Sequence, residues 1–339
     1  MLKIDMFNHI WPAAFYEQLK RAMGPMVDIT RRSEAVPMMT DLQERFRVMD
    51  MFEDYCQILS LASPPLELIG DPKLSAQLAR IGNDGMQELC DEFPDRFPGF
   101  IASLPMNDPQ AAIEESGRAV EELGALGVQM FTNVAGKPLD APEFRPLFEK
   151  MVEYDRPIWL HPARGANFPD YLTENRSLYE IWWTFGWPYE TSVALARLVF
   201  SRIMQDLPQL KIITHHAGGM VSFFEGRVGP GWDQLGARTS SEDYTVLLRE
   251  LDLRPIDYFR KFYADTATFG SRAALICAIE FFGIDNIVFA SDAPFDPEKG
   301  PMYIRETIKV IDSLDIDDAD RSRIYRDNAL RLTGLKIKS

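Results

Sequence analysis

Residues 157–216 have the sequence PIWLHPARGANFPDYLTENRSLYEIWWTFGWPYETSVALARLVFSRIMQDLPQLKIITHH. The runs at 157–161 and 211–215 are short, apolar and almost continuous, which is typical of parallel strands buried on both faces. Between them, residues 191–207 repeat apolar side chains every three or four positions, as a helix with one buried face does. A strand, a helix and a second strand in this order predict a βαβ unit.

The same alternation extends over the whole chain. Strands are predicted at 2–5, 55–61, 100–104, 127–131, 157–161, 211–215, 262–265 and 286–291. Helices are predicted at 41–52, 74–92, 109–123, 141–154, 191–207, 272–282 and 302–313. Eight such units predict an α/β fold, a closed (β/α)₈ (TIM) barrel, with residues 1–339 as a single domain. The alternative, an open doubly wound sheet, would need a glycine-rich turn after an early strand, and FNHIWP at 7–12 has no glycine.

Composition excludes several classes of protein. The net charge is −15, and no basic cluster is present to neutralise phosphates, so we expect no nucleic-acid partner. The three cysteines are an odd and sparse set, which argues against a disulfide framework, and they form no C-x-x-C pair that would indicate a thiolate metal site. No apolar run approaches the length of about 18 residues that spans a bilayer, and the first residues do not resemble a signal peptide. We expect a soluble cytoplasmic protein that does not bind membranes.

The four histidines all lie at or just after the end of a predicted strand: His9, His161, His215 and His216. Asp292 follows the last predicted strand in the same way. Because the carboxyl ends of barrel strands meet at one mouth, His9, His161, His216 and Asp292 are expected to lie together there. Imidazoles and a carboxylate suit Zn²⁺ or a similar divalent ion, and another histidine nearby could act as acid or base. The alternative for any one of them is an ordinary hydrogen-bonded residue.

The pair His215–His216 needs separate treatment, because adjacent residues on a strand point to opposite faces. We expect only one of the two to serve the site, and the other to pack against the helices or bond to a neighbour.

Six segments resemble, in the right order, those of the aminocarboxymuconate-semialdehyde decarboxylase family of amidohydrolase-related proteins. They are IDMFNHIWP, ELGALGVQM, WLHPAR, GWPYETSVALARLVFSRIMQDLP, LKIITHHAGGMVSFFEGRV and FASDAPF. The resemblance extends from Lys3 to about Leu332. It implies a divalent metal, with Zn²⁺ expected and Mn²⁺ as the alternative, and a homodimer or homotetramer.

The resemblance also implies roles for particular residues. His161 and Asp292 match metal ligands of the family, and His9 matches the second histidine of its opening H-x-H pair. His216 matches the catalytic histidine, and either it or Asp292 would move the proton. The first ligand of the pair is replaced here by Phe7, which cannot coordinate a metal. Three ligands remain, which is enough for a catalytic site, but a metal-independent enzyme is an alternative.

Arginine binds carboxylates through paired hydrogen bonds, so four arginines are candidates for holding an acidic substrate. Arg164, three residues after His161, is the first choice. Arg227 matches a family arginine that can act across a dimer interface, and Arg45 and Arg47 are further candidates for which a surface ion pair is the favoured alternative. Trp183, in an aromatic segment, is predicted either to line an apolar pocket or to pack at a helix or subunit interface.

We therefore expect a non-oxidative decarboxylase of a small aromatic or unsaturated carboxylic acid. One alternative is a hydrolase of a lactone or a related C–O or C–C bond, with or without a metal, and another is a hydratase. All of these could use the same metal and base. The remaining alternative is an inactive barrel, disabled by Phe7, that acts as a binding protein.

Overall fold

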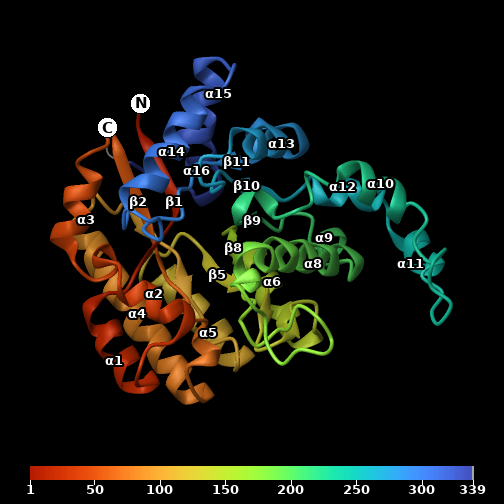
Figure 1. The fold of residues 1–339 in the computed structure, drawn as a ribbon, viewed down its shortest axis with the longest axis horizontal. Helices are drawn as coiled ribbons and strands as arrows, with labels where there is room; N and C mark the ends of the chain where they lie inside the picture. The colour runs from red at the N-terminus through yellow and green to blue at the C-terminus, as the bar shows by residue number, and fades with distance from the viewer. Residues whose placement is uncertain (338–339) are drawn as a thin grey trace.

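The strands form the predicted barrel in a computed structural model, which describes residues 1–337 (Figure 1). In chain order they are β1 (Lys3–Ile10), β2 (Tyr55–Leu61), β3 (Gly99–Phe100), β4 (Ala102–Ser103), β5 (Val128–Phe131), β8 (Ile158–His161), β9 (Ile212–Thr214), β10 (Tyr263–Asp265) and β11 (Ile287–Val288). A small hairpin of β6 (Asn133–Val134) and β7 (Lys137–Pro138) follows β5. Each predicted strand coincides with one of the barrel strands, and β3 and β4 together form the third.

All barrel pairings are parallel, in the orders β1-β2-β3 and β11-β10-β9-β8-β5-β4. Only Ile101 separates β3 from β4, so the two sheets are continuous at this point. On the other side the circle is closed by β1, because the Met6 amide donates to the Phe289 carbonyl at 2.8 Å and the Asp292 amide donates to the Phe7 carbonyl at 3.0 Å.

Helices surround this barrel (Figure 1). They are α1 (Ala13–Met23), α2 (Asp28–Glu34), α3 (Leu42–Met49), α4 (Pro72–Glu92), α5 (Pro109–Glu121), α6 (Arg145–Glu153), α7 (Ile181–Thr184), α8 (Gly186–Phe200), α9 (Ile203–Asp206), α10 (Glu225–Trp232), α11 (Thr245–Glu250), α12 (Pro255–Phe259), α13 (Arg272–Phe282), α14 (Pro301–Asp312), α15 (Asp318–Ser322) and α16 (Asn328–Thr333). The predicted helix 191–207 is in fact interrupted, because Arg202 adopts a left-handed backbone with φ of 66° between α8 and α9.

The long helices begin where a polar side chain can bind the free backbone amides. The Asp71 carboxylate accepts from the Leu74 amide at the start of α4, and Asp108 does the same for Ala111 at the start of α5. Their buried faces pack on the outside of the strands and form the larger apolar core.

A smaller apolar cluster fills the barrel interior, with Ile4, Met6, Phe7, Ile58 and Trp159 among its members. The interior is therefore packed rather than open, and access to the strand ends is from the mouth.

Two segments depart from the compact ring. The chain from β8 to α7 forms a long loop beside the mouth, and α10 and α11 extend outward from the barrel (Figure 1). Among the described helices, none has both the length and the apolar character needed to cross a membrane.

Candidate active site

The local structure of β1 places His9 at the mouth. The pairing of β1 with β2 shifts register between Asp5 and Asn8, so the strand bulges there and continues to Ile10, beyond the predicted end at residue 5. The Arg45 guanidinium fixes this bulge, because it donates to the Asn8 side chain at 3.2 Å and also to the His9 carbonyl.

Four buried side chains, one from each of four strand ends, converge at the mouth. His9, His161, His215 and Asp292 each offer a donor atom, and these atoms all lie within 4.8 Å of one another. His9 and His215 place their Nε2 atoms 3.1 and 3.2 Å from Asp292 Oδ1. The structure thus brings together the three predicted ligands, His9, His161 and Asp292, and adds His215 to them.

Hydrogen bonds determine which imidazole nitrogens face this cluster. Nδ1 of His9 lies 3.3 Å from the Leu61 carbonyl, and Nδ1 of His161 lies 2.7 Å from the Pro162 carbonyl. Nδ1 of His215 bonds to Asp265 Oδ2. Carbonyl and carboxylate oxygens can only accept here, so each Nδ1 carries a proton, and each Nε2, once deprotonated, can offer a lone pair to the cluster.

The electrostatics of the cluster also fit a cation. Burial lowers the pKa of His9 and lowers that of His161 well below its usual value, so both favour the neutral form that binds metals. Burial alone would lower the pKa of His215, but Asp265 and Asp292 raise it to about 10. Burial would raise the pKa of Asp292, but the neighbouring histidines, His215 foremost, hold it well below its usual value. The cluster therefore attracts positive charge, as a proton or as a metal ion, and its N₃O donor set fits Zn²⁺ or Mn²⁺.

Both histidines of the 215–216 pair face the site, contrary to the expectation that only one would. The reason is that β9 ends at Thr214, and His216 and Ala217 have left-handed backbones with φ of 53° and 54°. Strand alternation no longer applies there, and the two imidazole centroids lie 3.8 Å apart. His216 Nε2 lies 3.5 Å from Asp292 Oδ2, and its Nδ1 has no partner among the described residues.

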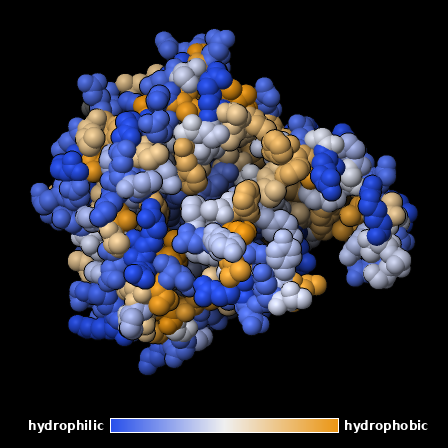
Figure 2. Space-filling model, viewed as in Figure 1, coloured by the Kyte–Doolittle hydropathy of each residue, from blue (hydrophilic) through white to orange (hydrophobic). Residues whose placement is uncertain are grey.

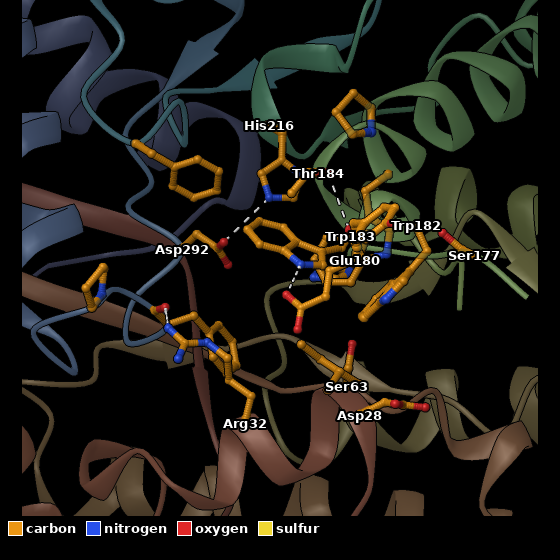
Figure 3. Close-up of a pocket in the computed structure, with 18 of the residues that line it drawn as sticks. Asp28, Arg32, Ser63, Ser177, Glu180, Trp182, Trp183, Thr184, His216 and Asp292 are labelled. Carbon is orange, nitrogen blue, oxygen red and sulfur yellow. Dashed lines mark hydrogen bonds and ion pairs between the residues drawn. The ribbon is translucent and has the colours of Figure 1, made fainter. Parts of the chain in front are cut away.

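A cavity of about 780 Å³ opens above the cluster. His161, His216 and Asp292 line its inner end, and its walls include seven aromatic side chains: Tyr179, Trp182, Trp183, Trp187, Phe269, Phe295 and Tyr303. Figure 2 shows the hollow near the centre of the face in view, with hydrophobic residues along one side. In Figure 3, Asp292 and His216 point toward each other. The cavity has the size and apolar walls of a small-molecule site.

The predicted substrate-binding residues have different outcomes. Trp183 lines the cavity, and its Nε1 donates to Glu180 at 3.0 Å. Arg164 does not line it, since its guanidinium lies over the Phe168 ring at 5.0 Å and 3.7 Å from Glu190. Arg227 lies exposed on α10, outside the cavity of its own chain.

Arg45 and Arg47 are also outside the cavity, so the expectation that they bind substrate needs correction. Arg45 is fully buried, and all of its nitrogens donate to the protein. Arg47, two residues further along α3, is exposed and pairs with Glu44 at 2.6 Å. The alternative of a surface ion pair therefore describes Arg47, while Arg45 stabilises the barrel beneath the site.

Several polar residues of the site were not predicted, among them Asp265, Arg32 and Arg176. Asp265 is the last residue of β10, so the rule that strand ends meet at the barrel mouth could have identified it. Arg32 and Arg176 are the arginines that line the cavity among residues 1–337. They come from α2 and from the loop after β8, and no sequence pattern connects those segments to the mouth.

The chain is similar in sequence and in fold to known proteins. A sequence model of the family described as Amidohydrolase matches residues 4–335. The chain is 32% identical over 307 residues to a gamma-resorcylate decarboxylase of a Rhizobium species, covering 86% of this chain and 87% of the relative. It is 27% identical to a 2-amino-3-carboxymuconate-6-semialdehyde decarboxylase of Dictyostelium discoideum, covering 98% and 92%. The crystal structure of a dihydroxybenzoic acid decarboxylase from a Polaromonas species, with bound manganese and the inhibitor 2-nitroresorcinol, is 28% identical with a TM-score of 0.79, covering 98% and 97%.

Proposed function

Since the chain belongs to the amidohydrolase family, we propose that it is a metal-dependent carboxy-lyase that decarboxylates a small aromatic or unsaturated acid without oxidation. The observation that carries the proposal is the position of the cluster. Three imidazole Nε2 atoms and the Asp292 carboxylate converge at the inner end of a cavity with aromatic walls. The similarity to several decarboxylases favours this activity over lactone hydrolysis or hydration.

The residues proposed to hold the metal are His9, His161 and Asp292. The manganese in the Polaromonas relative supports a divalent ion, and the donor set is equally suited to Zn²⁺. When bound, such an ion supplies Lewis-acid chemistry, which would orient an acidic substrate and stabilise negative charge that develops on it.

His216 is proposed to move the proton. Decarboxylation of an aromatic acid requires a proton at the ring carbon that bears the carboxylate, and the C–C bond then breaks so that its electron pair returns to the ring as CO₂ leaves. His216 lines the cavity and stacks against Trp187, with ring centroids 6.1 Å apart and an interplanar angle of 27°. Its Nε2 faces Asp292 Oδ2 at 3.5 Å, so the carboxylate can orient the imidazole and stabilise its protonated form.

The aromatic walls and the two arginines suggest how the rest of the substrate binds. Trp183 and Trp187 offer flat apolar surfaces to a ring. Arg32 is held by a hydrogen bond to the Phe295 carbonyl but keeps other donors free, so it can bind a hydroxyl or a second acidic group.

A homodimer or homotetramer is also proposed. The segment around α10 extends from the barrel and carries Arg227 and Phe223, which is 77% exposed. An apolar side chain so exposed on a projecting arm suits contact with a second copy. A cytoplasmic location stays a prediction.

The test is to measure metal content of the purified protein by mass spectrometry and then CO₂ release from a panel of hydroxybenzoates and muconates. We expect a divalent ion, CO₂ release from at least one acid, and loss of activity on chelation that Mn²⁺ or Zn²⁺ reverses. Hydrolysis of lactones without CO₂ release would contradict the proposal and favour the hydrolase. No turnover of any acid or lactone would favour the binding protein.

A further inference from the structure

Phe7 occupies the position where the resemblance places a metal ligand. Its ring is fully buried in the barrel interior and stacks on the His215 imidazole, with centroids 4.2 Å apart and an interplanar angle of 14°. The ring also lies 5.3 Å from the His9 imidazole and 5.8 Å from that of His161. Phe7 therefore fills the space beside the cluster and holds His215 in a fixed orientation against it.

His215 has the features of a metal ligand and lacks those of a substrate-facing base. It is fully buried and does not line the cavity. Its Nδ1 bonds to Asp265, whose other oxygen accepts from the Ala217 and Ala267 amides at 3.1 Å each. Its Nε2 belongs to the four-donor cluster and lies 3.2 Å from Asp292 Oδ1, without hydrogen-bond geometry to any of residues 1–337. A carboxylate behind an imidazole whose other nitrogen is free is the usual support of a metal-bound histidine.

We infer that His215 replaces the ligand lost at Phe7, so that the metal site of this chain is His9, His161, His215 and Asp292. The inference rests on the proposed function only in taking the site to hold a divalent metal. The adjacent histidines then have different roles. His215 binds the ion, and His216, which lines the cavity, remains the acid or base.

The competing occupant of the cluster is a proton. His215 lies between the carboxylates of Asp265 and Asp292, so an imidazolium there would supply one positive charge without any metal. A divalent ion would have to displace that proton. A protonated His215 and a metal-bound His215 predict different metal affinities. A metal titration therefore tests the inference without any assay of turnover.

The experiment compares wild type with His215→Asn. The matched control is His216→Asn, which changes the adjacent residue in the same way. The metal-free proteins are titrated with Mn²⁺ and Zn²⁺ against a chelator of known affinity. Pulsed electron paramagnetic resonance of the Mn²⁺ form counts the imidazole nitrogens bound to the ion. We expect three nitrogens in wild type and in His216→Asn, and two in His215→Asn. The affinity of His215→Asn should fall at least about 100-fold, because changes behind a ligand already cost 10–100-fold.

A compensating variant guards against simple misfolding of His215→Asn. Phe7→His combined with His215→Asn should recover most of the lost affinity, because it returns a ligand to β1. Two nitrogens in wild type, or unchanged affinity in His215→Asn, would overturn the inference, as would a wild type that binds neither ion. CO₂ release is measured separately, so absence of decarboxylation with three bound nitrogens would reject the proposed function and leave this site assignment standing.

Discussion

Replacing Arg45 with methionine should destabilise the protein without weakening substrate binding. The guanidinium donates to the Met38 carbonyl at 3.1 Å, to Gln57 Oε1 at 2.6 Å, to Asn8 Oδ1 at 3.2 Å and to the His9 carbonyl. Methionine fills much of the same volume but deprives all four buried acceptors of this donor. Each such acceptor costs about 1–3 kcal/mol, although these costs are not additive.

The charge of Arg45 adds to this effect. Burial lowers its pKa to about 10, so it is still a cation at pH 7, and it is electrostatically coupled to the buried Asp5. Burial raises the pKa of Asp5 to about 6, although Ser291 and Tyr55 lower it in part, so the carboxylate is mostly ionised at pH 7. Removing one partner from a buried charged network typically costs about 3–5 kcal/mol, and we expect a loss of that order in the free energy of unfolding at pH 7.

The assay is urea unfolding followed by circular dichroism, together with KM for the best acidic substrate. Arg47→Met is the matched control, because Arg47 lies on the same helix but is exposed, and its unfolding midpoint should not change measurably. The reasoning is refuted if Arg45→Met keeps the wild-type midpoint while its KM rises tenfold or more. That result would mean that Arg45 binds the substrate after all.

His216→Asn should lower kcat by about 10²-fold or more while metal content, measured by mass spectrometry, stays at the wild-type level. Arg32→Gln should raise KM about tenfold or more at unchanged metal content, because a hydrogen bond to a charged group contributes about 1.5–3 kcal/mol; an unchanged KM for every substrate would exclude Arg32 from binding. Burial raises the pKa of Glu67 from 4.5 to about 7, so the folded state binds a proton that the unfolded state has released, and stability falls as the pH rises through this range. Between pH 4 and pH 8 the free energy of unfolding of wild type should therefore fall by up to about 3 kcal/mol more than that of Glu67→Gln. If the free energies of unfolding of the two proteins change with pH in parallel over this range, the assignment is contradicted.

The strands were predictable because parallel barrel strands are buried on both faces and are therefore almost continuously apolar. The bulge in β1 was not, since it depends on hydrogen bonds from Arg45 and on closure against Phe289, both distant in sequence. The break between α8 and α9 at Arg202 could not be predicted either, because the apolar spacing of 191–207 does not indicate a residue with a left-handed backbone.

The site was predicted as far as strand ends determine it. His9, His161 and Asp292 meet because barrel topology alone brings strand ends together. The arginines were a different problem, since a side chain on a helix or loop reaches the mouth only through tertiary packing. For Arg45 a signal did exist: it lies three and four positions before Val48 and Met49, on the buried face of α3. An arginine on an apolar face is more consistent with an internal hydrogen-bond network than with a substrate site.

Phe7 also bears on the choice among decarboxylation, hydrolysis and hydration. Hydrolysis and hydration both need a water molecule held and activated beside the cluster, whereas decarboxylation adds only a proton and releases CO₂. The Phe7 ring packs against the His215 imidazole and offers no hydrogen bond to a water molecule on that side. Trp187 and Phe269 flank His216 from the cavity, with ring centroids 6.1 and 5.5 Å away, and they likewise offer apolar surface. A carboxylate placed against these apolar walls is poorly solvated, and its charge is cancelled when the ring carbon gains a proton and neutral CO₂ leaves, which relieves that penalty. The apolar ring that removes a family ligand therefore favours the reaction that needs no activated water.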